Sequence, residues 1–144
     1  LDVGADRIAR TAHAALTLLA ELRQLTQEPI PLAWHPQLTQ NLSAIEVYPA
    51  GTLKMMFDPL PVPRYKGKDG KNGRAAILQH LEQYVALPTS TDLLLKNDDA
   101  LDAALCVVAG ADFLRGLAEQ PTNLNQAQKE GWICVRTKSE QTNE

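Results

Sequence analysis

Only two segments of this chain have the pattern of β-strands, and this small number constrains the fold more than any other feature. They are SAIEVYPAG at residues 43–51 and EGWICVRT at residues 130–137, both rich in β-branched and aromatic residues. Three other segments, residues 1–26, 73–86 and 97–115, repeat apolar residues at helical spacing. Helices alternating with strands predict an α/β fold. However, two strands cannot cover three apolar helix faces, so we expect either part of a larger domain or a chain that pairs with another.

The composition is that of one folded domain. The 144 residues are 44% hydrophobic and 22% charged, and the net charge of −3 gives no general attraction to nucleic acid. No apolar run is long enough to cross a membrane. Cys106 and Cys134 lie in apolar surroundings, so we expect two buried free thiols and a cytoplasmic protein. The chain starts at Leu1 without a methionine or a signal-peptide pattern, and we expect a fragment or a processed product.

Residues 59–74, PLPVPRYKGKDGKNGR, form the only local basic cluster, and their Pro, Gly and Lys content predicts an exposed loop. A single acid, Asp69, accompanies five basic side chains, which are Arg64, Lys66, Lys68, Lys71 and Arg74. Two interpretations are open. The segment is either a solvated, mobile loop, or a loop in which Arg64, Lys66 and Lys68 contact phosphates while Tyr65 stacks on a base.

Asp99 and Asp102 lie three residues apart and therefore on one side of the third helix, at the rim of an apolar face. Two carboxylates in that position need a cation or a proton to compensate them. One interpretation is a Mg²⁺ or Mn²⁺ site, because these ions take oxygen ligands. The other is that the acids only stabilise the first turn of the helix. Glu46 interrupts the first strand near its end, and it is either an outward-facing residue or a further site residue.

Four stretches together resemble the C-terminal half of the domain of unknown function 429 family, whose members are described as predicted nucleases of the RNase H-like superfamily. The stretches are ADRIARTAHAALTLL, IEVYPAGTLK with a later YK, DDALDAALCVVAGADFLRG and EGWICV. The resemblance implies an RNase H-like mixed sheet flanked by helices, here lacking its N-terminal strands and two metal-binding acids. Asp99 and Asp102 match the acidic helix of RuvC-type resolvases, and Glu46 matches a strand glutamate of the family itself. The resemblance also covers residues without a known role, namely Asp6, Arg7, Tyr48 and Tyr65, the last of which precedes Lys66 in a Tyr-Lys pair.

The sequence thus predicts that residues 1–137 are the C-terminal part of a single RNase H-like domain and that residues 138–144 are a disordered tail. The resemblance implies a metal-dependent nuclease that hydrolyses phosphodiesters and is inactive as this fragment. In it, Asp99, Asp102 and Glu46 would be catalytic and would bind Mg²⁺ or Mn²⁺. The alternatives are a non-catalytic protein-interaction module and a small-molecule phosphotransfer or binding domain on the same scaffold. Expected partners are nucleic acid and a second copy of the chain or the missing N-terminal half, but not a membrane.

Overall fold

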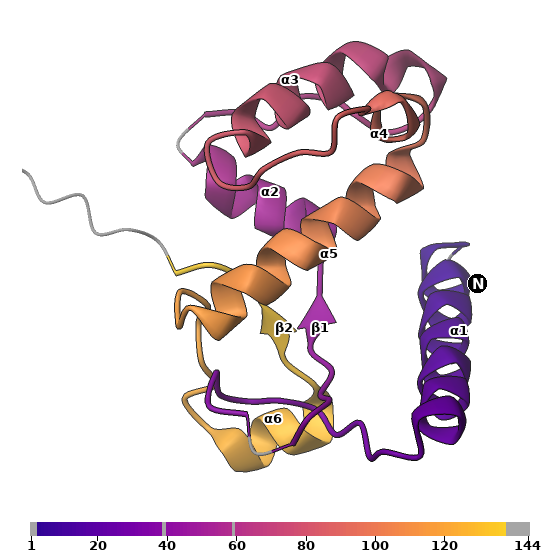
Figure 1. Ribbon diagram of the computed structural model, residues 1–144, viewed down its shortest axis with the longest axis vertical. Helices are drawn as coiled ribbons and strands as arrows, with labels where there is room; N and C mark the ends of the chain where they lie inside the picture. The colour runs from indigo at the N-terminus through magenta and orange to yellow at the C-terminus, as the bar shows by residue number, and fades with distance from the viewer. Residues whose placement is uncertain (1–2, 39, 59, 138–144) are drawn as a thin grey trace, which may run out of the picture. The chain divides into compact units, whose positions relative to one another are not determined.

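The computed structural model describes residues 3–38, 40–58 and 60–137, with side chains described from residue 9 onward (Figure 1). The predicted tail at residues 138–144 lies outside this range. The chain divides into two compact units. One comprises Leu1–Ala33 with Gln37–Ala44, and the other comprises Trp34–Pro36 with Ile45–Glu144. No described helix is both long and apolar enough to span a membrane.

The first unit consists of helix α1, Val3–Thr26, and the segment that follows it. Apolar residues at helical spacing predicted this helix, and the prediction is confirmed. Gln27 adopts a positive φ of 55° directly after the helix and ends it. The Arg23 guanidinium then donates a 2.7 Å hydrogen bond to the Ile30 carbonyl, which folds the following segment back along the last turn.

The second unit carries the remaining helices and both strands. In chain order the elements are β1 Glu46–Val47, α2 Pro49–Phe57, the 3₁₀ turn η1 Lys68–Gly70, α3 Lys71–Leu81, α4 Asp92–Lys96, α5 Asp98–Leu114, α6 Leu124–Glu130 and β2 Ile133–Cys134. The described part of the chain is therefore rich in helix and contains one small sheet. In Figure 1, α5 crosses this unit, with α2, α3 and α4 on one side of it and the two strands on the other.

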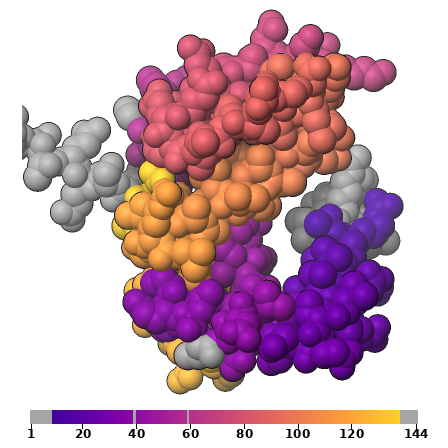
Figure 2. All heavy atoms as spheres, in the orientation of Figure 1, coloured from indigo at the N-terminus to yellow at the C-terminus, as the bar shows by residue number. Residues whose placement is uncertain are grey.

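Helix α5 organises the core of the second unit. Asn97 caps it, because its side-chain oxygen accepts hydrogen bonds of 2.8 and 3.2 Å from the amides of Asp99 and Ala100. The sequence offers either Asn97 or Asp98 as the cap of this helix, and the structure has Asn97; the predicted helix is confirmed. The side of α5 that packs into the core carries the buried side chains of Leu101, Leu105 and Val108. The core that surrounds these residues also contains Leu53, Met56, Phe57, Tyr65, Ile77, Leu78 and Leu81. Figure 2 shows the spheres of α3, α4 and α5, pink to orange, packed against one another.

The two predicted strand segments pair with each other in a parallel arrangement, in which Glu46 is opposite Ile133 and Val47 is opposite Cys134. Helices α2 to α6 supply the long crossover that a parallel pair needs. A buried carboxylate fixes the end of β2 to α5. Asp112, which is 2% exposed, accepts two hydrogen bonds from the Arg136 guanidinium, one of them 2.9 Å long.

Several local predictions were wrong. The loop expected at residues 59–74 ends early, since η1 and α3 begin at Lys68 and Lys71. The polar composition of residues 119–128, EQPTNLNQAQ, predicts a loop, but Leu124–Glu130 forms α6, which Asn123 caps by accepting a 3.1 Å hydrogen bond from the Gln126 amide. Cys134 is buried as expected, whereas Cys106 is exposed. The reason is that Leu101, Leu105 and Val108 define the buried side of α5, so Cys106 points away from the core.

Candidate functional site

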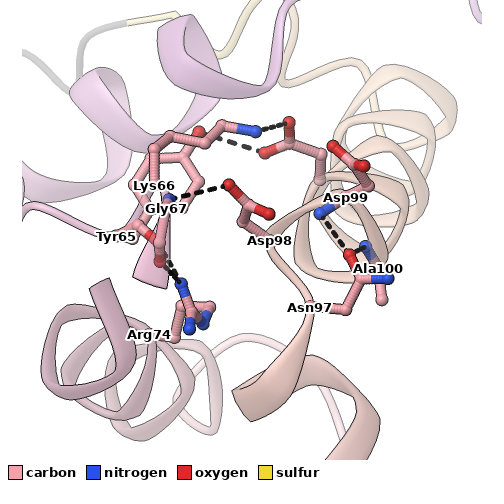
Figure 3. A network of polar contacts seen from close by, with 9 residues as sticks. Tyr65, Lys66, Gly67, Arg74, Asn97, Asp98, Asp99 and Ala100 are labelled. Carbon is pink, nitrogen blue, oxygen red and sulfur yellow. Dashed lines mark hydrogen bonds and ion pairs between the residues drawn. The ribbon is translucent and has the colours of Figure 1, made fainter. Parts of the chain in front are cut away.

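Three side chains from two distant motifs meet at the start of α5 (Figure 3). The Tyr65 hydroxyl donates a 3.0 Å hydrogen bond to one oxygen of Asp102, and the Lys66 ammonium donates to the other. Tyr65 is buried, while the side chains of Lys66 and Asp102 are 49% and 25% exposed. A partly exposed ion pair of this kind can exchange with a ligand, because solvent reaches both partners. We call Tyr65, Lys66 and Asp102 the Tyr-Lys-Asp cluster.

Burial of the phenol raises the pKa of Tyr65 well above its ordinary value of 10, and the negative charge of Asp102 adds to the shift. Smaller contributions to the raised pKa of Tyr65 come from Tyr48 and Asp98. The Tyr65 hydroxyl therefore stays protonated near neutral pH. It acts there as a hydrogen-bond donor.

A second carboxylate of the same helix turn holds the loop directly. Asp98 accepts a 3.0 Å hydrogen bond from the backbone amide of Gly67. This bond is the main reason why the pKa of Asp98 is lowered, with the charges of Lys66 and Arg74 adding to the effect. Gly67 has a φ of +77°, which a residue with a side chain adopts only with strain. The carboxylates of Asp98 and Asp102 thus both accept hydrogen bonds from the segment between Tyr65 and Gly67.

Arg74 fixes the same segment from the other side. It is 4% exposed, and each of its hydrogen bonds in the structure goes to a backbone carbonyl. These acceptors are the carbonyls of Leu95, at 2.8 Å, Gly67, at 3.0 Å, and Tyr65. Sequence reasoning placed Arg74 in a solvated loop, and that was wrong. The guanidinium is buried because its fork of donors satisfies one carbonyl of α4 and two carbonyls of the loop before η1.

Glycines allow the loop to approach α3 this closely. A Cβ atom on Gly73 would lie 1.9 Å from the Arg64 carbonyl oxygen, and one on Gly70 would lie 2.1 Å from the Tyr65 carbonyl oxygen. Neither position has room for a side chain. The spacing Gly67-x-x-Gly70-x-x-Gly73-Arg74 was visible in the sequence, but we read it only as loop composition. It was the signal that could have indicated an ordered, closely packed turn.

The structure brings some of the predicted site residues together and separates others. Asp102, Tyr65 and Lys66 form one cluster, whereas Asp99 is exposed on the same turn of α5. Arg64 is exposed, and its carbonyl packs against α3. Lys68 lines a neighbouring hollow on the surface of the second unit. The side chains of the family-matched Asp6 and Arg7 are outside the described residues.

Glu46 belongs to a different surface of the second unit. It lines an open hollow of about 510 Å³ beside β2. The other residues of this hollow are Glu119, Glu130, Gly131, Trp132, Ile133 and Val135. The charge of Glu46 contributes to the raised pKa of Cys134, after burial of that thiol. The third acid of the predicted metal site is therefore not gathered with the two acids of α5.

The described residues do not form a complete site for Mg²⁺ or Mn²⁺. Among residues 3–38, 40–58 and 60–137, no three His, Cys, Asp or Glu side chains are arranged to hold a metal ion. Asp102 is already paired with Lys66, so a metal ion would have to displace an ammonium group. The metal remains a prediction from the sequence.

The comparisons with known proteins place the chain in a family. The model of the family described as "Protein of unknown function (DUF429)" matches residues 4–126, which is most of the 144-residue chain. The searches of curated proteins and of solved structures found no match. The match covers both the Tyr65–Lys66 motif and the acidic start of α5, the two segments that the structure joins. The chain therefore belongs to the DUF429 family.

Proposed function

We propose that this chain binds nucleic-acid phosphates beside the start of α5 and forms part of a phosphodiester-hydrolysing enzyme of the RNase H-like kind. The observation that carries the proposal is the Tyr-Lys-Asp cluster. It unites two motifs that lie 36 residues apart in the sequence around one carboxylate that is 25% exposed and one ammonium group that is 49% exposed. RNase H-like chemistry is what the resemblance of these motifs to the family implies.

Two residues of the cluster, Lys66 and Tyr65, and the neighbouring Asp99 have distinct roles in this proposal. The Lys66 ammonium exchanges part of its contact with Asp102 for a phosphate oxygen, since it is half exposed. Tyr65, protonated near neutral pH, donates its hydroxyl to Asp102 and keeps that carboxylate in a fixed orientation. Asp99, exposed three residues before Asp102 on α5, is the carboxylate available to contact an attacking water.

Phosphate binding is tested by fluorescence anisotropy with labelled single-stranded and double-stranded oligonucleotides over a series of salt concentrations. Lys66→Met should weaken binding to the single strand about fivefold at 0.1 M salt, because one lost phosphate contact removes about 0.7 from the salt slope. The matched control is Lys54→Met, which removes the same charge from an exposed position on α2. Equal affinities of the two variants would contradict the assignment of Lys66.

Hydrolysis is tested on the same oligonucleotides and on an RNA–DNA hybrid, in buffers with and without Mg²⁺ or Mn²⁺. Asp99→Asn and Asp102→Asn should each abolish cleavage, whereas Asp92→Asn, which alters an exposed acid on α4, should not. Cleavage that survives both substitutions in α5 would overturn the catalytic part of the proposal. Binding without any cleavage would restrict the function of this chain to phosphate binding.

A second candidate function is self-association, as in a protein-interaction module. Helix α1 exposes three leucines at helical spacing, namely Leu18 at 54%, Leu22 at 37% and Leu25 at 80%. Exposed apolar residues on one side of a helix are typical of a helix that pairs with another. Light scattering should then give twice the mass of the 15.8 kDa chain, and Leu25→Glu should restore the monomer. A monomer at all concentrations would remove this candidate.

A further inference from the structure

A basic hollow lies beside the Tyr-Lys-Asp cluster, on the other side of the loop that Asp98 and Arg74 hold. It has a volume of about 470 Å³. We call it the lysine hollow, and the residues that line it are Gly67, Lys68, Lys71, Arg74, Leu95, Lys96 and Asp98. Four cationic side chains here face one carboxylate. The hollow is therefore locally positive, although the chain as a whole carries a net charge of −3.

The positive charge in the wall of the hollow is fixed in place. Arg74 is buried and bonded to three backbone carbonyls, which hold its guanidinium in place, and no carboxylate of the described residues is hydrogen-bonded to it. A buried guanidinium without a bonded anion projects its field into the adjacent hollow, since protein screens it less than water does. The lowered pKa of Asp98 includes a contribution from this charge.

The three lysines, by contrast, are free to turn toward a ligand. Lys68 and Lys71 are exposed, and their side chains form no ion pair in the described structure. Lys96 is 72% exposed, and its only ion pair is with Asp92 at 3.8 Å, a contact that solvent weakens strongly. A hollow that combines one rigid cation with three adjustable ones matches an anion with several oxygens. A phosphate group has that form.

The loop that forms the hollow is ordered before any ligand arrives. Gly70 and Gly73 let the backbone of Tyr65 and Arg64 lie directly on α3, with no room for a Cβ atom. Gly67 closes the turn with its positive φ. Binding would therefore require ordering of the lysine side chains only, and this small entropic cost favours measurable affinity.

We propose that the lysine hollow binds a phosphate group of a nucleic-acid strand, through Lys68, Lys71 and Lys96 around the fixed charge of Arg74. The inference rests on the proposed function and extends it, since it gives a strand a second point of attachment beside the Tyr-Lys-Asp cluster. Asp98 stands between the two sites and bonds the Gly67 amide, so both sites share one rigid turn. Free inorganic phosphate is the other source of the same chemistry, and the experiment distinguishes the two.

The test is a titration followed by amide NMR, with inorganic phosphate in one arm and a thymidine octanucleotide in the other. Lys71→Met combined with Lys96→Met should weaken oligonucleotide binding tenfold or more. It should also reduce the salt slope by about 1.4, which is two contacts at about 0.7 each. The matched control combines Lys54→Met with Lys129→Met, two exposed lysines on α2 and α6. Equal weakening by both pairs would overturn the proposal, because it would indicate net charge alone.

The two proposals can fail separately. If Lys66→Met weakens binding while the Lys71 and Lys96 pair does not, the lysine hollow is not a site and the proposed function stands. If inorganic phosphate shifts the amides of Gly67 and Gly70 but no oligonucleotide binds, the hollow takes free phosphate only, and both the inference about a strand and the proposed binding of nucleic acid are wrong. Thermal unfolding of each variant verifies that it is folded, and the lysines replaced are exposed.

Discussion

Two glycine-to-alanine substitutions in helices should change stability in opposite directions. Gly73 lies in α3 and Gly110 in α5, and neither has a positive φ. Alanine is favoured over glycine inside a helix by about 1 kcal/mol, so propensity alone predicts a gain at both positions. We expect that gain for Gly110→Ala. We expect a net loss for Gly73→Ala.

The difference follows from the space around each Cβ atom. At Gly110 nothing lies within 4 Å of it, whereas at Gly73 it would meet the Arg64 carbonyl oxygen at 1.9 Å and the carbonyl carbon at 2.6 Å. The obstacle is backbone, so the loop itself has to move. Overpacking of this kind costs about 1–3 kcal/mol. Because the propensity gain is shared, the difference in unfolding free energy between the two variants should also be about 1–3 kcal/mol.

Urea unfolding followed by circular dichroism measures that difference. Gly73→Ala should also shift the amide resonance of Gly67, since displacing the loop disturbs its bond to Asp98. Gly110→Ala should leave that resonance in place. If both alanine variants were equally stable, the loop would not rest on α3 as described. The contacts of Tyr65 and Lys66 with Asp102 depend on the same loop position and would then be wrong as well.

Three further predictions concern charged groups. Arg136→Met should destabilise the protein by about 3 kcal/mol in urea unfolding, because it leaves the 2% exposed Asp112 carboxylate unpaired; a loss below 1 kcal/mol would contradict this. Folding lowers the pKa of Asp98, so its contribution is present at neutral pH and is lost as the pH falls through the lowered pKa. Thermal unfolding from about pH 5 down to about pH 2 should therefore show a smaller acid-induced loss for Asp98→Asn than for the wild type, and parallel curves would refute this. Limited trypsin digestion should cut after the exposed Lys68 and spare the bond after Arg74, which is 4% exposed; early cleavage after Arg74 would show that α3 does not hold it.

The helices and the positions of the two strands were predictable wherever a local pattern determined them. α1 and α5 follow from apolar spacing, and Asn97 followed by two aspartates indicates where α5 begins. The strands around Glu46 and Ile133 were found from their β-branched residues. α6 was missed because its sequence, LNQAQKE, buries only Ala127 and therefore shows almost no apolar periodicity. The sequence signals for α6 were Asn123 as its cap and Gly131 as the residue that ends it. Each is a single residue of a type that is also common in loops.

The composition of the site depended on packing between distant segments. Sequence reasoning selected Asp102, Tyr65 and Lys66 separately, but only the folded chain shows that they touch. It grouped Glu46 with the α5 acids because Glu46 lies near the end of a strand and matches a strand glutamate of the family, yet Glu46 faces a different hollow. Arg74 was assigned to solvent because a charged residue is usually exposed. It is buried here because three carbonyls, two of them in the preceding loop, converge on it.

The short parallel sheet has a consequence for the order of folding. β1 and β2 join residues near position 46 to residues near position 133, so nearly the whole second unit lies in the loop that they close. Closing such a loop in an unfolded chain costs about 4 kcal/mol of entropy, which a pairing of two residues per strand does not recover. The strands therefore come together only after α2 to α5 have condensed and brought the ends near each other. In pulsed hydrogen exchange, the amides around Cys134 should gain protection later than those of Leu101 and Leu105.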